Sequence, residues 1–216
     1  MLQRRWTTQR RIDNPRRPVM FRPMRATDTR EHLLSAGLRT LHAHGFNASG
    51  VQDITDAAGV PKGSFYNHFD SKETFGAAVL SRYWEERAAR ALAVLSDETL
   101  PPLERLRRYF AAKTAARTEK SFDRGCMIGN FAAELSGQSR LVRDQLGAVL
   151  AAWTNLLSRC LAEAQAEAAI ATDIDPDTMA AFLIDAFEGA VLRTKVTRDT
   201  APLARFKHIV FTKLLA

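Results

Sequence analysis

Apolar residues recur every three or four positions along most of this chain, the spacing that places them on one face of an α-helix. The first such segment begins at Asp28 and Glu31, an Asp-x-x-Glu pair of the capping-box kind, and Gly45 is placed to end it. A second segment is VQDITDAAG, residues 51–59. Pro61 can open a third helix, because the first helical position does not need the N–H that proline lacks. The pattern therefore predicts three short helices in the first part of the chain.

A long fourth helix is predicted from about Ser71 into the 90s, and a second Asp-x-x-Glu pair, Asp70 and Glu73, marks its start. Asp175, just before Pro176, marks another helix start. The helical spacing returns in residues 101–117, 125–137, 141–169, 176–196 and 201–216. No segment shows the two-residue alternation that a half-buried strand would give. We therefore predict an all-α fold, in which a larger helical body follows the three short helices.

The composition restricts the class of protein. The chain has 216 residues, of which 46% are hydrophobic, and this is enough for a sizeable core. No run approaches the ~18 apolar residues of a membrane span, and no apolar segment follows the basic N-terminus as it would in a secretory signal. The two cysteines, Cys126 and Cys160, give neither a disulfide framework nor a metal-ligand spacing. We expect a cytoplasmic protein without a membrane partner, a metal site or a cofactor.

The positive charge is concentrated at the N-terminus. The formal net charge is +7, and residues 1–25 account for all of it, because they carry eight arginines and a single acid, Asp13. This segment has prolines and no helical period, so we predict a disordered, arginine-rich tail. Two interpretations stay open. The tail could lie along the phosphates of DNA, or translation could start downstream at Met20 or Met24.

The stretch PKGSFYNHFDSKE, residues 61–73, follows a short helix and a turn that contains glycine. Two short helices joined in this way form a helix-turn-helix, whose second helix presents its N-terminal residues to the major groove of DNA. Phe65 and Phe69 are expected to pack this helix onto the core. The other candidates offer a cation, a close backbone approach or a hydrogen-bonding group to phosphates and base edges. They are Lys62, Gly63, Ser64, Tyr66, Asn67, His68 and Lys72.

Residues 45–73, GFNASGVQDITDAAGVPKGSFYNHFDSKE, resemble the DNA-binding domain of the TetR family of bacterial regulators. The resemblance rests on a glycine and an aromatic residue, a short second helix, and then the contiguous pattern G-V-x-K-G-x-x-Y-x-x-F-x-x-K-E. It implies a double-stranded operator as the partner. The positions that it implies for operator contact are Lys62, Gly63, Ser64, Tyr66, His68 and Lys72, with Ser49 and Gln52 near the second helix.

The resemblance also implies how the chain is divided. Residues 1–25 would be the tail, 26–72 the helix-turn-helix domain, and 73–216 a helical domain for ligand sensing and dimerisation. In the family pattern two late helices, here 141–168 and 176–197, pack against their copies in a four-helix interface. Several of the side chains that could supply this interface must instead face their own core; the candidates are Leu150, Trp153, Leu157, Leu161, Phe182, Ala186 and Val191. A homodimer implies a palindromic operator, with half-sites about one DNA turn of ~34 Å or a multiple apart.

Two later segments, GCMIGNFAAELS and FEGAVLRTKV, are similar to a subgroup of TetR regulators that includes NemR and AcuR. Members of that subgroup release DNA in response to reactive electrophiles, oxidants or small unsaturated acids. The similarity implies a repressor, with Cys126 as the sensing thiol and Lys195 as its partner.

The chemistry expected of Cys126 agrees with this implication. A thiol at a helix N-terminus, near a cation such as Arg124, Arg193 or Lys195, is shifted towards the reactive thiolate. Oxidation would give a sulfenic acid, which a nitrogen or a second thiol can trap. Two alternatives stay open: Cys126 is a small core residue, or it only lines a pocket that binds a small acrylate-like acid reversibly. Cys160 is interpreted as a core or interface residue.

Further side chains could line a pocket between the body helices. A buried amide or carboxylate needs a hydrogen-bonding partner, so Asn130 and Glu188 would meet either a ligand or a structural partner. The aromatic candidates, each of which is more often plain core, are Tyr109, Phe110, Phe131, Trp153 and Phe187.

Enzyme classes are disfavoured. The five histidines are scattered, and His42 and His44 would point to different faces of one helix. No glycine-rich phosphate loop follows a strand. We therefore expect a regulator and not an enzyme.

Overall fold

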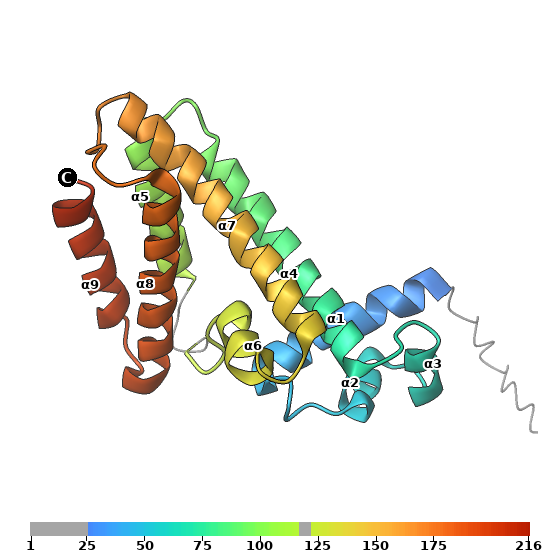
Figure 1. Ribbon diagram of the computed structural model, residues 1–216. Helices are drawn as coiled ribbons and strands as arrows, with labels where there is room; N and C mark the ends of the chain where they lie inside the picture. Colours follow the sequence, from blue (N-terminus) through green and yellow to red (C-terminus); the bar gives the residue numbers. More distant parts are fainter. Residues whose placement is uncertain (1–25, 117–121) are drawn as a thin grey trace, which may run out of the picture.

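The computed structural model describes residues 26–116 and 122–216, and it contains no strand in these ranges. Figure 1 shows α1, α2 and α3 at one end of the long helices α4 and α7, with α5, α8 and α9 at the other. The predicted all-α class is confirmed. The helices are α1 (Ala26–His44), α2 (Val51–Ala58), α3 (Lys62–Tyr66), α4 (Lys72–Leu95), α5 (Pro102–Ala115), α6 (Met127–Leu135), α7 (Arg140–Ala166), α8 (Pro176–Thr197) and α9 (Ala201–Ile209), followed by a π-helical segment, Val210–Leu214.

The three short helices form as the pattern predicts, with small differences at their ends. Helix α1 begins at Ala26, so that Asp28 lies in its first turn, where a negative charge meets the positive end of the helix dipole. Gly45 follows α1 with a φ of +85°, a conformation that glycine adopts without strain. Pro61 precedes α3 as its N-cap and is not its first residue, because its ψ of 145° is extended.

The long helix α4 connects the short helices to the body. Its N-cap is Ser71, whose hydroxyl accepts a hydrogen bond from the N–H of Thr74, so the prediction that Asp70 caps this helix was wrong. Lys72 and Glu73 lie in the first turn of α4, which runs unbroken to Leu95. The predicted domain boundary at residues 72 and 73 therefore falls inside a continuous helix, which can carry a movement from one part to the other.

Aromatic side chains fill the core of the body. Phe110 of α5 lies 5.6 Å from Phe187 of α8 and 5.0 Å from Phe206 of α9, measured between ring centroids. Trp153 of α7 lies 6.0 Å from Trp84 of α4. The core thus joins α4, α5, α7, α8 and α9, and Phe110 and Phe187 are core residues.

Four of the predicted interface side chains are buried within their own subunit, which corrects part of the predicted interface. Trp153, Leu157, Leu161 and Val191 are each at most 2% exposed, so these four cannot supply contacts to a second subunit. Helix α7 packs against α4 and also against α8. Of the other candidates, Leu150 and Phe182 are exposed and Ala186 is partly buried.

The predicted tail, residues 1–25, lies outside the described residues. The two candidate start residues, Met20 and Met24, lie outside them too. Within residues 26–116 and 122–216, no helix combines the length and the apolar composition that crossing a lipid bilayer requires.

Candidate functional site

Helices α2 and α3 are joined by a tight turn. Gly59 ends α2 in the left-handed conformation, with a φ of 67°. The N–H of Val60 donates to the carbonyl of Thr55 at 3.0 Å, and Pro61 then leads into α3. Ile54 of α2 and Phe65 of α3 are both fully buried, so the two helices share one core. This is the geometry of a helix-turn-helix, in which one helix holds the other at the surface.

Most of the predicted DNA-contacting side chains of this segment face solvent. Lys62, Gly63 and Asn67 are exposed, and Tyr66 has 55% of its surface exposed, which is high for an aromatic ring. Ser64 and His68 are half-buried. Phe65 and Phe69 are buried beneath them, as predicted. The surface is therefore free to meet a duplex, and contact with DNA stays a prediction for each of these residues.

Three of the predicted DNA contacts lie outside α3, and their side chains have different surroundings. Ser49 is 1% exposed and its hydroxyl donates to the carbonyl of Gly45 at 2.7 Å, so the prediction that its side chain contacts DNA was wrong. Gln52 is exposed on α2, with its amide donating to Asp56. Lys72 is half-buried, and its ammonium donates to the carbonyl of Phe46 at 2.7 Å. Lys72 thus ties α4 to the α1–α2 loop, and desolvation lowers the pKa of its ammonium.

Cys126 is the N-cap residue of α6, as the predicted helix start requires, and it is 5% exposed. The hydroxyl of Tyr83 on α4 donates to its Sγ at 3.8 Å and accepts from the N–H of Met127 at 3.3 Å. Burial raises the pKa of Tyr83 above its usual range, so this hydroxyl stays protonated. The thiol therefore lies at the start of a helix, held against the middle of α4.

A cavity of about 250 Å³ adjoins this thiol. Four of the predicted sensing residues line it together, namely Cys126 and Asn130 at the start of α6 and Glu188 and Lys195 on α8. The ammonium of Lys195 donates to Oδ1 of Asn130 at 3.3 Å, and Nδ2 of Asn130 donates to the carbonyl of Arg124 at 2.7 Å. Cys126 and Lys195 thus border the same space, and their role in sensing stays a prediction. We call this space the Cys126 cavity.

The aromatic candidates do not line the Cys126 cavity. Phe131 is fully buried and lies edge-on to Phe46 of the α1–α2 loop, at 5.9 Å between ring centroids. Trp153 is 1% exposed and its indole N–H donates to the hydroxyl of Tyr109 at 2.6 Å. Their prediction as pocket residues was therefore wrong for Phe131 and Trp153, which are core. Tyr109 lines a different cavity.

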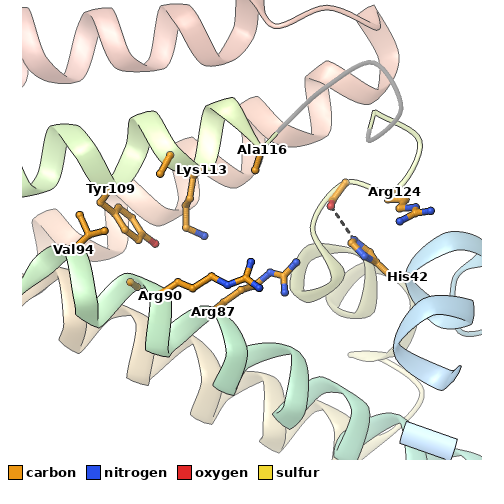
Figure 2. Close-up of a pocket in the computed structure, with 11 residues that line it drawn as sticks. His42, Arg87, Arg90, Val94, Tyr109, Lys113, Ala116 and Arg124 are labelled. Atoms are coloured by element: carbon orange, nitrogen blue, oxygen red, sulfur yellow. Dashed lines mark hydrogen bonds between the residues drawn. The ribbon is translucent and has the colours of Figure 1, made fainter. Parts of the chain in front are cut away.

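This second cavity, of about 270 Å³, lies between α4, α5 and the end of α1 (Figure 2). Arg87 and Arg90 of α4 and Lys113 of α5 bring cationic groups to it, and Tyr109 brings a hydroxyl. The sequence reasoning missed these cations. The signal that could have found them is the spacing of Arg87 and Arg90, three apart and so on one face of a helix. We call this space the cationic cavity.

Tyr83 contacts residues that line each of the two cavities. The guanidinium of Arg87 lies over its ring, 3.4 Å from the centroid, and the ring of His42 meets it edge-on at 5.4 Å. A nitrogen of His42, Nε2, is 3.1 Å from the carbonyl oxygen of Gly125, the residue before Cys126. The side chain of Tyr83 thus contacts His42 and Arg87 through its ring and the thiol of Cys126 through its hydroxyl.

Cys160 has no such surroundings. It is 2% exposed and its thiol donates to the carbonyl of Pro102 at 3.3 Å. Burial raises its pKa to about 11, which keeps it protonated and unreactive at neutral pH. Its interpretation as a core residue agrees with this placement. In the part of the chain that the structure describes, no group of three or more histidine, cysteine or acidic side chains is arranged to hold a metal ion.

Comparison with known proteins covers both parts of this architecture. Residues 33–79 match the model of the bacterial regulatory proteins of the tetR family, and residues 102–210 match that of the tetracyclin repressor-like C-terminal domain. The HTH-type transcriptional repressor DhaR of Mycobacterium sp. (strain GP1) is 42% identical over 89% of this chain and 95% of its own length. The transcriptional regulator AcuR of Cereibacter sphaeroides is 35% identical over 89% of both chains.

The HTH-type transcriptional repressor NemR of Escherichia coli is 30% identical over 86% of this chain and 95% of its own length. The crystal structure of its reduced form superposes with a TM-score of 0.78 and 29% sequence identity, over 86% of this chain and 97% of that one. The expected similarity to NemR and AcuR is therefore confirmed.

Proposed function

Because this chain belongs to the TetR family of bacterial regulators, we propose that it is a repressor that leaves its operator when a reactive electrophile or an oxidant modifies Cys126. The family and the relatives named above are DNA-binding transcriptional regulators and not enzymes. The observation that carries the finer proposal is the position of α6. The N-terminal end of α6 borders the Cys126 cavity, and two of its side chains, Phe131 and Glu134, contact the α1–α2 loop.

The operator would be contacted by the surface of α3 and the residues that follow it. Lys62, exposed at the start of α3, would meet a phosphate, and Gly63 would let the backbone approach the duplex closely. Tyr66 and Asn67, which are both exposed, can reach further, to phosphates or base edges. Phe65 holds this surface on the core.

A homodimer would present two such surfaces. Helices α8 and α9 pack on each other and leave large apolar side chains uncovered, and such exposed surface commonly marks an interface. Phe182 is 54% exposed, Leu192 62% and Ile209 54%. The dimer would therefore use α8 together with α9, in place of the predicted pairing with α7. Its symmetry would require a palindromic operator.

Modification of Cys126 needs no group beyond those in the cavity and the incoming reagent. An α,β-unsaturated carbonyl compound would form a bond from Sγ to its β-carbon, and the thiol proton would end on the α-carbon with no leaving group. A peroxide would form an S–O bond while its O–O bond breaks, giving a sulfenic acid and water. The Nζ of Lys195 could then form an S–N bond, with loss of a second water and of a proton. Each product is larger than the thiol in a 5% exposed site.

Helix α6, together with Gly125 before it, would carry this change to the DNA-binding part through three contacts. Gly125 bonds to His42 at the end of α1, Phe131 packs on Phe46, and Oε2 of Glu134 accepts the N–H of Asn47 at 2.8 Å. A group added at the N-cap of α6 displaces a helix that contacts the α1–α2 loop through Phe131 and Glu134. The expected result is a change in the position of α3 relative to its copy in the dimer.

The test replaces each cysteine with serine and measures operator affinity by fluorescence anisotropy after treatment with N-ethylmaleimide, hydrogen peroxide or the unreactive acid propionate. Maleimide and peroxide should release wild type and the control Cys160→Ser, and should leave Cys126→Ser on DNA. Release of Cys126→Ser by peroxide would show that Cys126 is not the sensor. Release of both variants by propionate would instead support the second candidate function, in which a small acid binds reversibly. The cationic side chains that line the neighbouring cavity favour this candidate.

A further inference from the structure

We propose that the hydroxyl of Tyr83 activates Cys126 for its reaction with electrophiles, by a hydrogen bond that stabilises the thiolate, and that Arg87 strengthens this bond. The proposal rests on the repressor function proposed above and deepens it, because it names the groups that make the sensing thiol reactive. Both groups belong to α4, so the rate of sensing would be set by a different helix from the one that Cys126 caps.

Cys126 needs such a group because it is buried. It is 5% exposed, and burial disfavours the charged thiolate, which is the form that reacts. Cys160 shows the effect of burial in this protein, since desolvation raises the pKa of its thiol to about 11. A hydrogen-bond donor aimed at the sulfur opposes this penalty, because it binds the thiolate more strongly than the thiol.

The backbone of α6 orients the hydroxyl of Tyr83 towards the sulfur. The N–H of Met127 can only donate, and it lies 3.3 Å from the hydroxyl oxygen. The hydroxyl proton can therefore point to Sγ of Cys126, which is 3.8 Å away. This distance is long for a hydrogen bond, and it can shorten when the sulfur becomes an anion. The sequence from N–H to hydroxyl to sulfur also connects the thiolate to the positive end of α6, since each donor polarises the next.

Tyr83 keeps its proton, which makes it a donor and not a base. Its side chain is 1% exposed, and burial raises the pKa of the hydroxyl above its usual range. The proton on the sulfur of Cys126 must therefore leave to water, and the electron pair left on Sγ forms the bond to the electrophile. Tyr83 makes this ionisation more favourable and neither gains nor loses an atom.

Arg87 is placed to strengthen the donor. It lies one turn after Tyr83 on α4, at the i, i+4 spacing that puts two side chains on one face of a helix. The Cζ of its guanidinium is 3.4 Å from the centroid of the Tyr83 ring, and its positive charge opposes the rise that burial causes in the pKa of Tyr83. A phenol polarised by a cation donates a stronger hydrogen bond. Arg87 is thus a positioning residue that acts on the sulfur through Tyr83.

Other ionisable groups also lie near the thiol. Lys195 and Glu188 of α8 line the Cys126 cavity, while His42 and Arg124 line the cationic cavity together with Gly125. All of them are retained in the variants below, so a difference between variants reports the groups of α4.

The test measures how fast iodoacetamide alkylates Cys126 over a range of pH, by mass spectrometry of the full chain carrying Cys160→Ser, so that one thiol remains. The thiolate displaces iodide, so the rate rises with pH through the pKa of the thiol and then levels off. Tyr83→Phe keeps the ring and removes the donor. The midpoint of the profile should move up by about one pH unit, because a hydrogen bond to a charged group contributes about tenfold more than one to a neutral group.

The two ends of the profile should respond differently to Tyr83→Phe. Below both midpoints the thiolate fraction falls about tenfold, but the thiolate is a better nucleophile, so the rate should fall about threefold. The plateau at high pH should not fall, for the same reason. A purely structural role of Tyr83 would instead lower the plateau and leave the midpoint in place.

The variants of Arg87 test the same donor with Tyr83 intact. Arg87→Gln should also move the midpoint up, and Arg87→Lys, which keeps a cation beside the ring, should restore part of the shift. Two matched controls should keep the wild-type midpoint. Tyr109→Phe removes the hydroxyl of a second buried tyrosine, and Arg90→Gln removes an exposed arginine from the next turn of α4.

The proposal is overturned if Tyr83→Phe leaves the midpoint unchanged or shifts it no more than Tyr109→Phe does. Equal effects of Arg87→Gln and Arg90→Gln would overturn the role of Arg87, and would overturn the whole proposal if Tyr83→Phe did not fold. The repressor function fails on a different result, namely that protein fully alkylated at Cys126 keeps its affinity for the operator.

Discussion

Glu134 offers the sharpest test of how a change at Cys126 reaches the DNA-binding helices. Its Oε2 accepts the N–H of Asn47 at 2.8 Å, and this bond crosses from α6 to the α1–α2 loop. Hydrogen bonds to charged groups contribute about 1.5–3 kcal/mol when buried. Because Asn47 is exposed and water can replace the lost acceptor, we take about 1 kcal/mol for this one. A free energy of that size changes an equilibrium constant by a factor of about five.

Glu134→Ala should therefore reduce the coupling and not the DNA binding itself. The quantity to measure is the operator Kd of the maleimide-treated protein divided by that of the untreated protein, by fluorescence anisotropy. This ratio should fall about fivefold relative to wild type, within the usual range of coupling energies. Glu85→Ala, which removes an exposed carboxylate from α4, is the matched control and should keep the wild-type ratio. An unchanged ratio in Glu134→Ala, or a loss of untreated operator binding greater than the loss of coupling, would refute the assigned role.

Three further outcomes follow from the packing. Phe65→Ala should lower the free energy of unfolding by about 3–5 kcal/mol in urea denaturation, because Phe65 is fully buried; a loss below about 1 kcal/mol would mean that α3 is not held by this core. Brief treatment of the native protein with iodoacetamide at neutral pH should label Cys126 before Cys160 in peptide mass spectrometry, because burial holds the pKa of Cys160 at about 11; equal labelling would contradict this. Gly125→Ala should lower the free energy of unfolding by about 1–2 kcal/mol. Gly125 has a φ of +63°, and a methyl group there would lie 2.9 Å from Cδ of Lys195. A variant as stable as wild type would show that the loop relaxes freely.

The sequence predicted the local structure well where the signals are local. Glycines at the ends of α1 and α2 and the Asp175 cap of α8 depend only on neighbouring backbone, and all three are observed. Asp70 was mistaken for the cap of α4 because Ser71 beside it is an equally good capping residue, and only the backbone angles decide between them.

The candidate site was harder to predict, because it depends on which helix faces meet. Cys126 and Lys195 were paired through family resemblance, and the packing of α6 on α8 puts them on one cavity. Phe131 and Trp153 have the same residue type and spacing whether they line a cavity or fill the core, so periodicity could not separate the two roles. The cationic cavity combines Arg87 and Lys113 from two helices, and no pattern along the chain joins residues of α4 and α5.

The central claim is that α3 and the residues after it lie in the groove of an operator. It is tested most directly by selecting duplexes from a random pool with the full chain and then measuring their affinities for Lys62→Ala and Asn67→Ala over a range of salt. The account predicts a palindromic consensus. Lys62→Ala should weaken every duplex and reduce the salt slope by about one for each subunit. Asn67→Ala should instead change which sequences are preferred. A wild-type protein that enriches no sequence, or equal losses on all duplexes for both variants, would contradict the account.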